Sequence, residues 1–177
     1  MLTPHVFILE ISVNIICGIY ETQGQNVTDS LVKYVVDTWA RHFRDIDLST
    51  ATDADVARVL KCMMSILKYI NNVARTFENN YAEEGSYAPY VDMLGGRSLN
   101  GSNPFLERLI EWLGRALSMG PSFFDQQTYQ WVHNSSSTPS KIMADLARGH
   151  VENWLRTPSI EHRPYKFATA ALDLVSA

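Results

Sequence analysis

Cysteine and charge are both scarce in this sequence. Cys17 and Cys62 are the only cysteines among 177 residues, too few for a disulfide framework and too far apart to indicate a cysteine-based zinc site. We expect both to be small buried hydrophobic residues. Charged residues make up 19% of the chain and hydrophobic residues 46%, with four tryptophans. This composition excludes a disordered chain and predicts a globular domain with large core anchors.

Long apolar runs are lacking too. No run reaches the roughly 18–20 apolar residues that cross a bilayer. The apolar stretch 5–17 has no basic residue before it and contains Glu10 and Asn14, which argues against a secretory signal peptide. We therefore expect a soluble, intracellular (cytoplasmic) protein with no membrane span. Three Asn-X-Ser/Thr triplets point mildly the other way, at Asn26, Asn100 and Asn134.

The sequence signatures of enzyme and metal sites are missing as well. No P-loop, Gly-x-Gly-x-x-Gly fingerprint or Gly-x-Ser-x-Gly nucleophile elbow occurs, and the five histidines lack the His-Glu-x-x-His spacing of a zinc site. The aspartates between residues 45 and 55 lack the glycine and terminal glutamate of a calcium loop, so helix capping explains them better. We expect no cofactor and no metal.

Periodic apolar positions predict an all-α fold. We expect a single helical domain over residues 1–177, built as a bundle of five to six helices. The predicted helices cover residues 26–44, 52–77, 105–119, 122–133, 138–155 and 166–175. The predicted connections are a long Gly-rich one at 83–103 and loops at 134–138 and 157–165.

The N-terminal apolar segment, residues 6–20, fits two structures. The alternation of apolar and polar residues over 11–15 is typical of a short half-buried strand. A lone strand needs a partner that the rest of the sequence does not obviously provide, which favours a helix nearly as much. Both alternatives stay open at this point.

The clearest predicted helix, residues 52–77, carries charge of one sign after its first turn. No acidic residue lies between Val56 and Phe77, and at 100° per residue the cations gather opposite the apolar face. Four residues form this basic stripe: Arg58, Lys61, Lys68 and Arg75. A solvated helix face is the simplest explanation, but such faces usually mix both signs. The stripe therefore implies an acidic partner.

Several partners fit the basic stripe. A protein partner or a second copy of this chain would supply acidic groups, and so would the chain's own first 55 residues, which hold 8 acidic and 3 basic side chains. Single-stranded nucleic acid fits too, with Tyr69 and Tyr81 placed to stack on bases. The net charge of −4 means that any such binding is local.

Arg156 and His162 have five residues between them, a spacing that resembles the Arg-x5-His signature of the helical HEPN ribonucleases. The resemblance implies an enzyme in which this arginine and histidine act on the RNA backbone. Here Pro158 and Pro164 flank a segment that is helical in that family. A small HEPN-like hydrolase or ribonuclease is the alternative function.

Short fragments resemble the helical core of flexible filamentous plant-virus coat proteins. They are Trp39-Ala-Arg-His42, and Asn153-Trp154 followed by Lys166-Phe-Ala168 and Asp173. The resemblance implies a coat subunit that polymerises around RNA, which is one form of self-assembly. The leading hypothesis is broader: a non-enzymatic interaction or assembly protein that contacts an acidic partner through the basic stripe.

Overall fold

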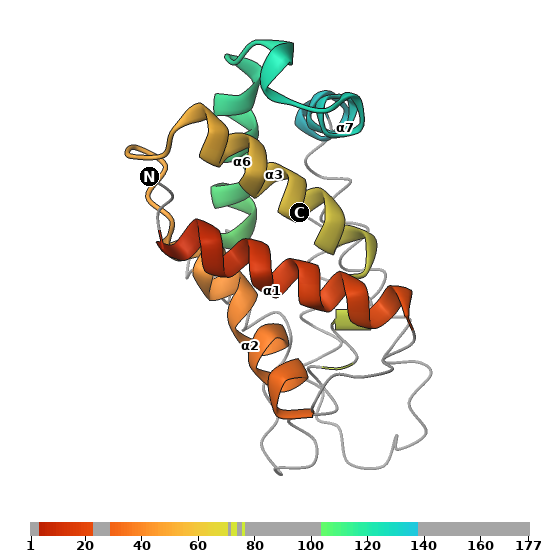
Figure 1. Cartoon of the computed structure of the whole chain (residues 1–177). Coiled ribbons are helices and arrows are strands. Elements are labelled where there is room, and N and C mark those ends of the chain that lie inside the picture. The colour runs from red at the N-terminus through yellow and green to blue at the C-terminus, as the bar shows by residue number, and fades with distance from the viewer. Residues whose placement is uncertain (1–3, 23–28, 71, 74–75, 77–103, 138–177) are drawn as a thin grey trace, which may run out of the picture.

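The fold comes from a computed structural model that describes residues 4–22, 29–70, 72–73, 76 and 104–137. This part of the chain is an all-α bundle, as the apolar periodicity predicted (Figure 1). Its elements are α1 (Pro4–Glu21), α2 (Asp29–Asp45), α3 (Asp53–Lys68), α6 (Pro104–Leu117), the 3₁₀ turn η1 (Pro121–Phe123) and α7 (Gln126–Ser137). The predicted connections 83–103 and 157–165, and the predicted helices 138–155 and 166–175, lie outside the described residues.

The N-terminal segment is a helix and not a strand. Its buried residues recur every three or four positions, the period of a helix: Val6, Leu9, Ser12, Val13 and Ile16. A helix satisfies its backbone groups internally, so the segment needs no partner strand. Within the described ranges, α1 alone has the length and apolar composition to cross a membrane, and a buried core helix passes the same test. Its inner face packs on α2 and α3.

Helix α3 lies at the centre of the bundle. It packs against α1, α6, α7 and η1, while α2 packs on α1 and contacts α6. Figure 1 shows α1 and α3 side by side, with α6 passing behind α3. Helices α1 and α2 run antiparallel, because the start of α1 meets the end of α2 at His5 and His42.

The largest buried side chains gather where α2 meets α6. The Phe105 ring centroid lies 5.7 Å from that of Trp39 and 5.3 Å from that of Phe43, and Phe43 lies 6.2 Å from Trp112. All four side chains are fully buried. We call these four rings the aromatic cluster. Such ring pairs stabilise a core beyond the area that they bury.

Two arginines of α6 hold the connection between α2 and α3. Arg115 donates to the backbone oxygens of Leu48 and Ala51, each at 3.1 Å, and to the Asp53 carboxylate at 3.2 Å. Arg108 donates to the backbone oxygen of Ile46, at the start of the same connection. Three backbone carbonyls of this connection thereby gain charged donors.

Helix α3 begins where the sequence predicts and ends earlier. Thr52 and Asp55 form a capping box: the Thr52 hydroxyl accepts from the Asp55 N–H at 3.2 Å, and the Asp55 carboxylate accepts from the Thr52 N–H at 3.1 Å. The helix predicted over 52–77 is broken once: the described residues 70, 72–73 and 76 are helical as predicted, but α3 itself ends at Lys68. There the Tyr69 N–H donates to the Ile66 carbonyl three residues back, which forms a turn.

The loop predicted over 134–138 was also wrong, because α7 continues to Ser137. The Ser136 hydroxyl donates to the Val132 carbonyl at 2.6 Å, and Ser135 is buried. Serine hydroxyls that bond to a carbonyl one turn back are satisfied within a helix, so a run of serines does not have to end it.

The helix predicted over 122–133 begins later than expected. Residues 121–123 form η1, and α7 begins at Gln126. Asp125 caps α7, since its carboxylate accepts the Thr128 N–H at 2.8 Å. The cap places the acidic side chain of Asp125 beside α3.

The two cysteines pack with the apolar residues. Cys62 is buried in the core and Cys17 is half-buried against it, and both are free thiols. Burial raises the pKa of Cys62 to about 12 and that of Cys17 to about 11. Both thiols therefore stay protonated and are poor nucleophiles at neutral pH.

Candidate interaction site

The first half of the basic stripe, Arg58 and Lys61, faces carboxylates of the same chain. The Arg58 guanidinium lies 3.8 Å from the Glu10 carboxylate of α1, and the Lys61 ammonium lies 3.0 Å from the Asp125 carboxylate. The two cationic side chains remain 46% and 63% exposed. Ion pairs this exposed contribute about 0–1 kcal/mol. A competing anion can therefore displace either carboxylate at little cost.

Lys68, the third residue of the stripe, contacts Tyr69, which in turn binds α1. The Tyr69 hydroxyl donates to the Glu21 carboxylate at 2.9 Å, and its ring stacks on Tyr20 with centroids 5.9 Å apart. The Lys68 ammonium lies 5.1 Å from the centroid of the Tyr69 ring. Its hydrogen bond to Tyr69 raises the pKa of Lys68. Tyr69, which the sequence predicted as a stacking residue, thus has one side of its ring covered by this chain.

The acidic groups that meet the stripe come from two places. Glu10 and Glu21 belong to the first 55 residues, the acidic part of the sequence. Asp125 belongs to the cap of α7. Acidic side chains from the chain's own N-terminal part, one of the partners left open by the sequence, therefore lie beside the stripe.

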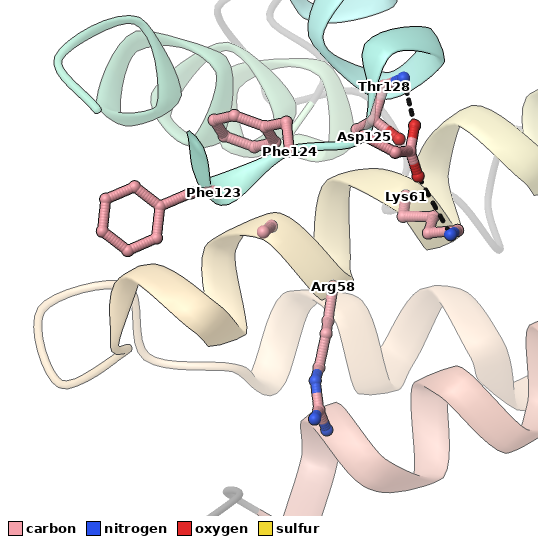
Figure 2. Close-up of a pocket in the computed structure, with 7 residues that line it drawn as sticks. Arg58, Lys61, Phe123, Phe124, Asp125 and Thr128 are labelled. Atoms are coloured by element: carbon pink, nitrogen blue, oxygen red, sulfur yellow. Dashed lines mark hydrogen bonds and ion pairs between the residues drawn. The ribbon is translucent and has the colours of Figure 1, made fainter. Parts of the chain in front are cut away.

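A surface hollow of about 250 Å³ lies between α3 and the start of α7. Its lining consists of Ala57, Arg58, Lys61, Phe123, Phe124, Asp125 and Thr128. Figure 2 shows Asp125 between Thr128 and Lys61, with Arg58 extended toward α1. The ring of Phe123 stands away from Asp125 (Figure 2), and Phe123 is 48% exposed. This site, which we call the α3–α7 hollow, combines two cations with an exposed aromatic ring.

Asp125 uses its two carboxylate oxygens for different contacts. Oδ1 accepts the Thr128 N–H, and Oδ2 lies against the Lys61 ammonium. The backbone hydrogen bond from Thr128, together with the bond from Lys61, lowers the pKa of Asp125 to about 2. The carboxylate is therefore charged at neutral pH, and it can cap α7 whether or not Lys61 is bound.

The sequence predicted only the α3 side of the hollow. Phe123 and Asp125 were not identified as site residues, because they lie far along the chain from Lys61. The one local signal is the position of Asp125 three residues before Thr128, which is typical of a helix cap. That signal marks a helix start but does not identify the helix beside it.

A second polar contact was also missed. His5 on α1 and His42 on α2 bring their Nδ1 atoms to 3.3 Å, with ring centroids 5.6 Å apart. Burial, followed by the charge of His5, lowers the pKa of His42. No spacing rule pairs two histidines 37 positions apart, since only the antiparallel packing of α1 on α2 brings them together.

The remaining predicted residues lie outside the described part of the chain: Arg75, Tyr81, Arg156 and His162. The HEPN-like alternative therefore stays a prediction. Within the residues that the structure describes, no three His, Cys, Asp or Glu side chains converge as a metal cluster. A search of protein-family models, curated proteins and solved structures finds no match to this chain.

Proposed function

We propose that this protein is a non-enzymatic interaction protein that binds an acidic segment of another protein at the α3–α7 hollow. The observation that supports this most directly is the exposure of Arg58 and Lys61 beside the exposed ring of Phe123. Aromatic residues and arginine are enriched in protein interfaces. The cations would meet carboxylates of the partner, and Phe123 would pack on an apolar side chain.

The internal ion pairs are compatible with this function. Because the Lys61 and Asp125 side chains are 63% and 45% exposed, their separation leaves no buried charge without a partner. Asp125 keeps its bond to the Thr128 N–H when Lys61 moves to a partner carboxylate. One surface ion pair is then exchanged for another, and α7 stays capped.

The mixed charge around the hollow favours a protein partner over nucleic acid. Glu10 and Asp125 lie against the two cations, and the whole chain carries a charge of −4. A phosphate backbone gains most from a groove of uniformly positive charge. A segment with one or two carboxylates beside an apolar side chain fits two cations and a phenylalanine better. The acidic first 55 residues of a second copy would also be such a partner.

A fluorescent peptide of alternating glutamate and leucine tests this proposal. We expect its anisotropy to rise with added protein, and we expect that binding to weaken as NaCl screens the charges. Replacing both cations, Arg58→Glu with Lys61→Glu, should abolish binding. Phe123→Ala should weaken binding without changing its salt dependence, because it removes apolar contact only.

Control variants and peptides distinguish binding at the α3–α7 hollow from a general effect of the net charge. Arg41→Glu reverses an exposed cation of α2 that does not line the hollow, and it should leave binding unchanged. Equal loss in this variant would contradict a defined site. A peptide with lysine in place of glutamate should not bind. Tighter binding of oligothymidylate than of the acidic peptide would favour nucleic acid as the partner, and light scattering would reveal self-association.

A further inference from the structure

We propose that His5 and His42 form a binding site for a divalent transition-metal ion that links α1 to α2. Their Nδ1 atoms lie 3.3 Å apart. Two imidazole nitrogens bound to one tetrahedral ion, each at roughly 2.0–2.1 Å, stand about 3.3–3.4 Å from each other. The two rings therefore already hold the spacing that such an ion requires.

Both rings can present a free lone pair to the ion. Metal ligation needs neutral imidazole. Burial of His42, and after it the neighbouring His5, disfavours the protonated form of His42. One Nδ1 proton is shared in the contact between the rings. On binding, that proton moves from Nδ1 to Nε2 of the same ring by exchange with solvent, so both Nδ1 lone pairs face the ion and both Nε2 atoms carry a proton. Both residues are half-buried, so an ion can reach them from solvent.

The donor set indicates which ions bind. Two imidazole nitrogens suit Cu²⁺, Ni²⁺ and Zn²⁺, in the general order of affinity that places Cu²⁺ first, and they suit Mg²⁺ and Ca²⁺ poorly. In the described ranges, no third His, Cys, Asp or Glu side chain joins the pair. Water would complete the coordination, which makes this a weaker site than a three-ligand zinc centre.

The two charged residues beside His42 have opposite effects on a bound cation. Asp45 lies one turn after His42 on α2, where it attracts a cation, and Arg41 next to His42 repels one. The site therefore depends on the two nitrogens and not on a strong local field. Its expected consequence is structural, because an ion bound only by the folded chain stabilises the contact between α1 and α2.

Thermal unfolding of the full chain, stripped of metal with EDTA and dialysed, tests the proposal. We expect ZnCl₂ and NiCl₂ to raise Tm in a saturable way and MgCl₂ to leave it unchanged. His5→Asn and His42→Asn each remove a ligand and should weaken zinc affinity by at least the roughly 10–100-fold that loss of an outer-shell partner costs. His133→Asn, on the exposed face of α7, is the matched control and should retain the full shift.

Two results would overturn the site. One is the same zinc-dependent shift in the wild type and in the double variant His5→Asn with His42→Asn, which would place binding at other histidines. The other is no shift in the wild type. If the double variant does not fold, the single variants decide. Imidazole ¹⁵N spectra of the wild type give a second measurement: zinc should move the Nδ1 signals of these two rings, and MgCl₂ should leave them unchanged.

Discussion

Arg115 on α6 and Lys61 on α3 carry the same charge in very different surroundings. Arg115 is 34% exposed and binds two backbone carbonyls and the Asp53 carboxylate. Lys61 is 63% exposed and meets one carboxylate, that of Asp125. The first cation satisfies two backbone carbonyls and a carboxylate at once. The second can give up its contact to a partner. The number and kind of acceptors thus separate a structural cation from one available for binding.

The same contrast holds for the aromatic residues. Phe105 is fully buried within the aromatic cluster, whereas Phe123 is 48% exposed at the α3–α7 hollow. We therefore expect substitutions at the α2–α6 junction to change stability, and substitutions at the hollow to change binding.

The largest expected loss of stability comes from the aromatic cluster. Phe105→Ala removes the ring that contacts both Trp39 and Phe43, and we expect the free energy of unfolding to fall by about 3–5 kcal/mol. Urea denaturation followed by tryptophan fluorescence measures this change. A loss as small as that of Phe123→Ala would contradict the distinction between the two regions.

Arg115→Met should have the next largest effect. The backbone oxygens of Leu48 and Ala51 lose a charged donor, and we expect a loss of about 1–2 kcal/mol after allowance for the solvent exposure of this site. Urea denaturation again measures it. The matched change on α3, Lys61→Met, must cost clearly less for the comparison to hold.

Asp125 lies at the hollow but also caps α7, so it combines a position in the binding site with a role in stability. Asp125→Ala should cost about 1 kcal/mol through loss of the cap, and Asp125→Asn should cost less. Since the fold lowers the pKa of Asp125 from 3.8 to about 2, the charged form stabilises the protein fully above pH 3.8. That contribution is lost as the pH falls toward 2. Asp125→Asn should flatten this part of a stability curve measured against pH.

The histidine contact predicts a second, smaller acid effect. Burial and then His5 lower the pKa of His42, with Arg41 acting in the same direction and Asp45 against it. The neutral form is therefore favoured in the folded protein, and stability should be lost as the pH falls below 6.5. His42→Gln should remove that loss in metal-free buffer. An unchanged curve in this variant would contradict the assignment.

Lys61→Met is the smallest expected change and the sharpest test of the comparison. We expect the free energy of unfolding to stay within about 0.5 kcal/mol of wild type, while binding of the acidic peptide weakens. Denaturation and anisotropy on the same protein sample provide both values. A large loss of stability would show that Lys61 is structural, like Arg115.

The sequence predicted the elements that have strong local signals. Thr52 with Asp55 marks the start of α3, and Pro104 marks that of α6; both helices begin there. The errors arose where contacts override local preference. Ser136 bonds back into its own helix, and Tyr69 lies in a turn that its apolar neighbours do not reveal. The segment 6–20 stayed ambiguous because its outer side is apolar as well.

The candidate site was predictable only where one helix carries it. Arg58 and Lys61 follow from the charge pattern of α3, but Asp125 and Phe123 reach them through the packing of α7 on α3. Packing between elements distant in the sequence leaves no mark on composition or spacing. For that reason the hollow needed the three-dimensional structure.

The aromatic cluster also has a consequence for synthesis of the chain. Phe105 follows Phe43 by 62 positions, so at 5–20 residues per second roughly 3–12 s separate the two on the ribosome. During that interval α1, α2 and α3 can associate, while Phe43 still lacks its contacts with the rings of α6. The nascent chain therefore exposes an aggregation-prone apolar surface for seconds, which is the kind of surface that chaperones recognise.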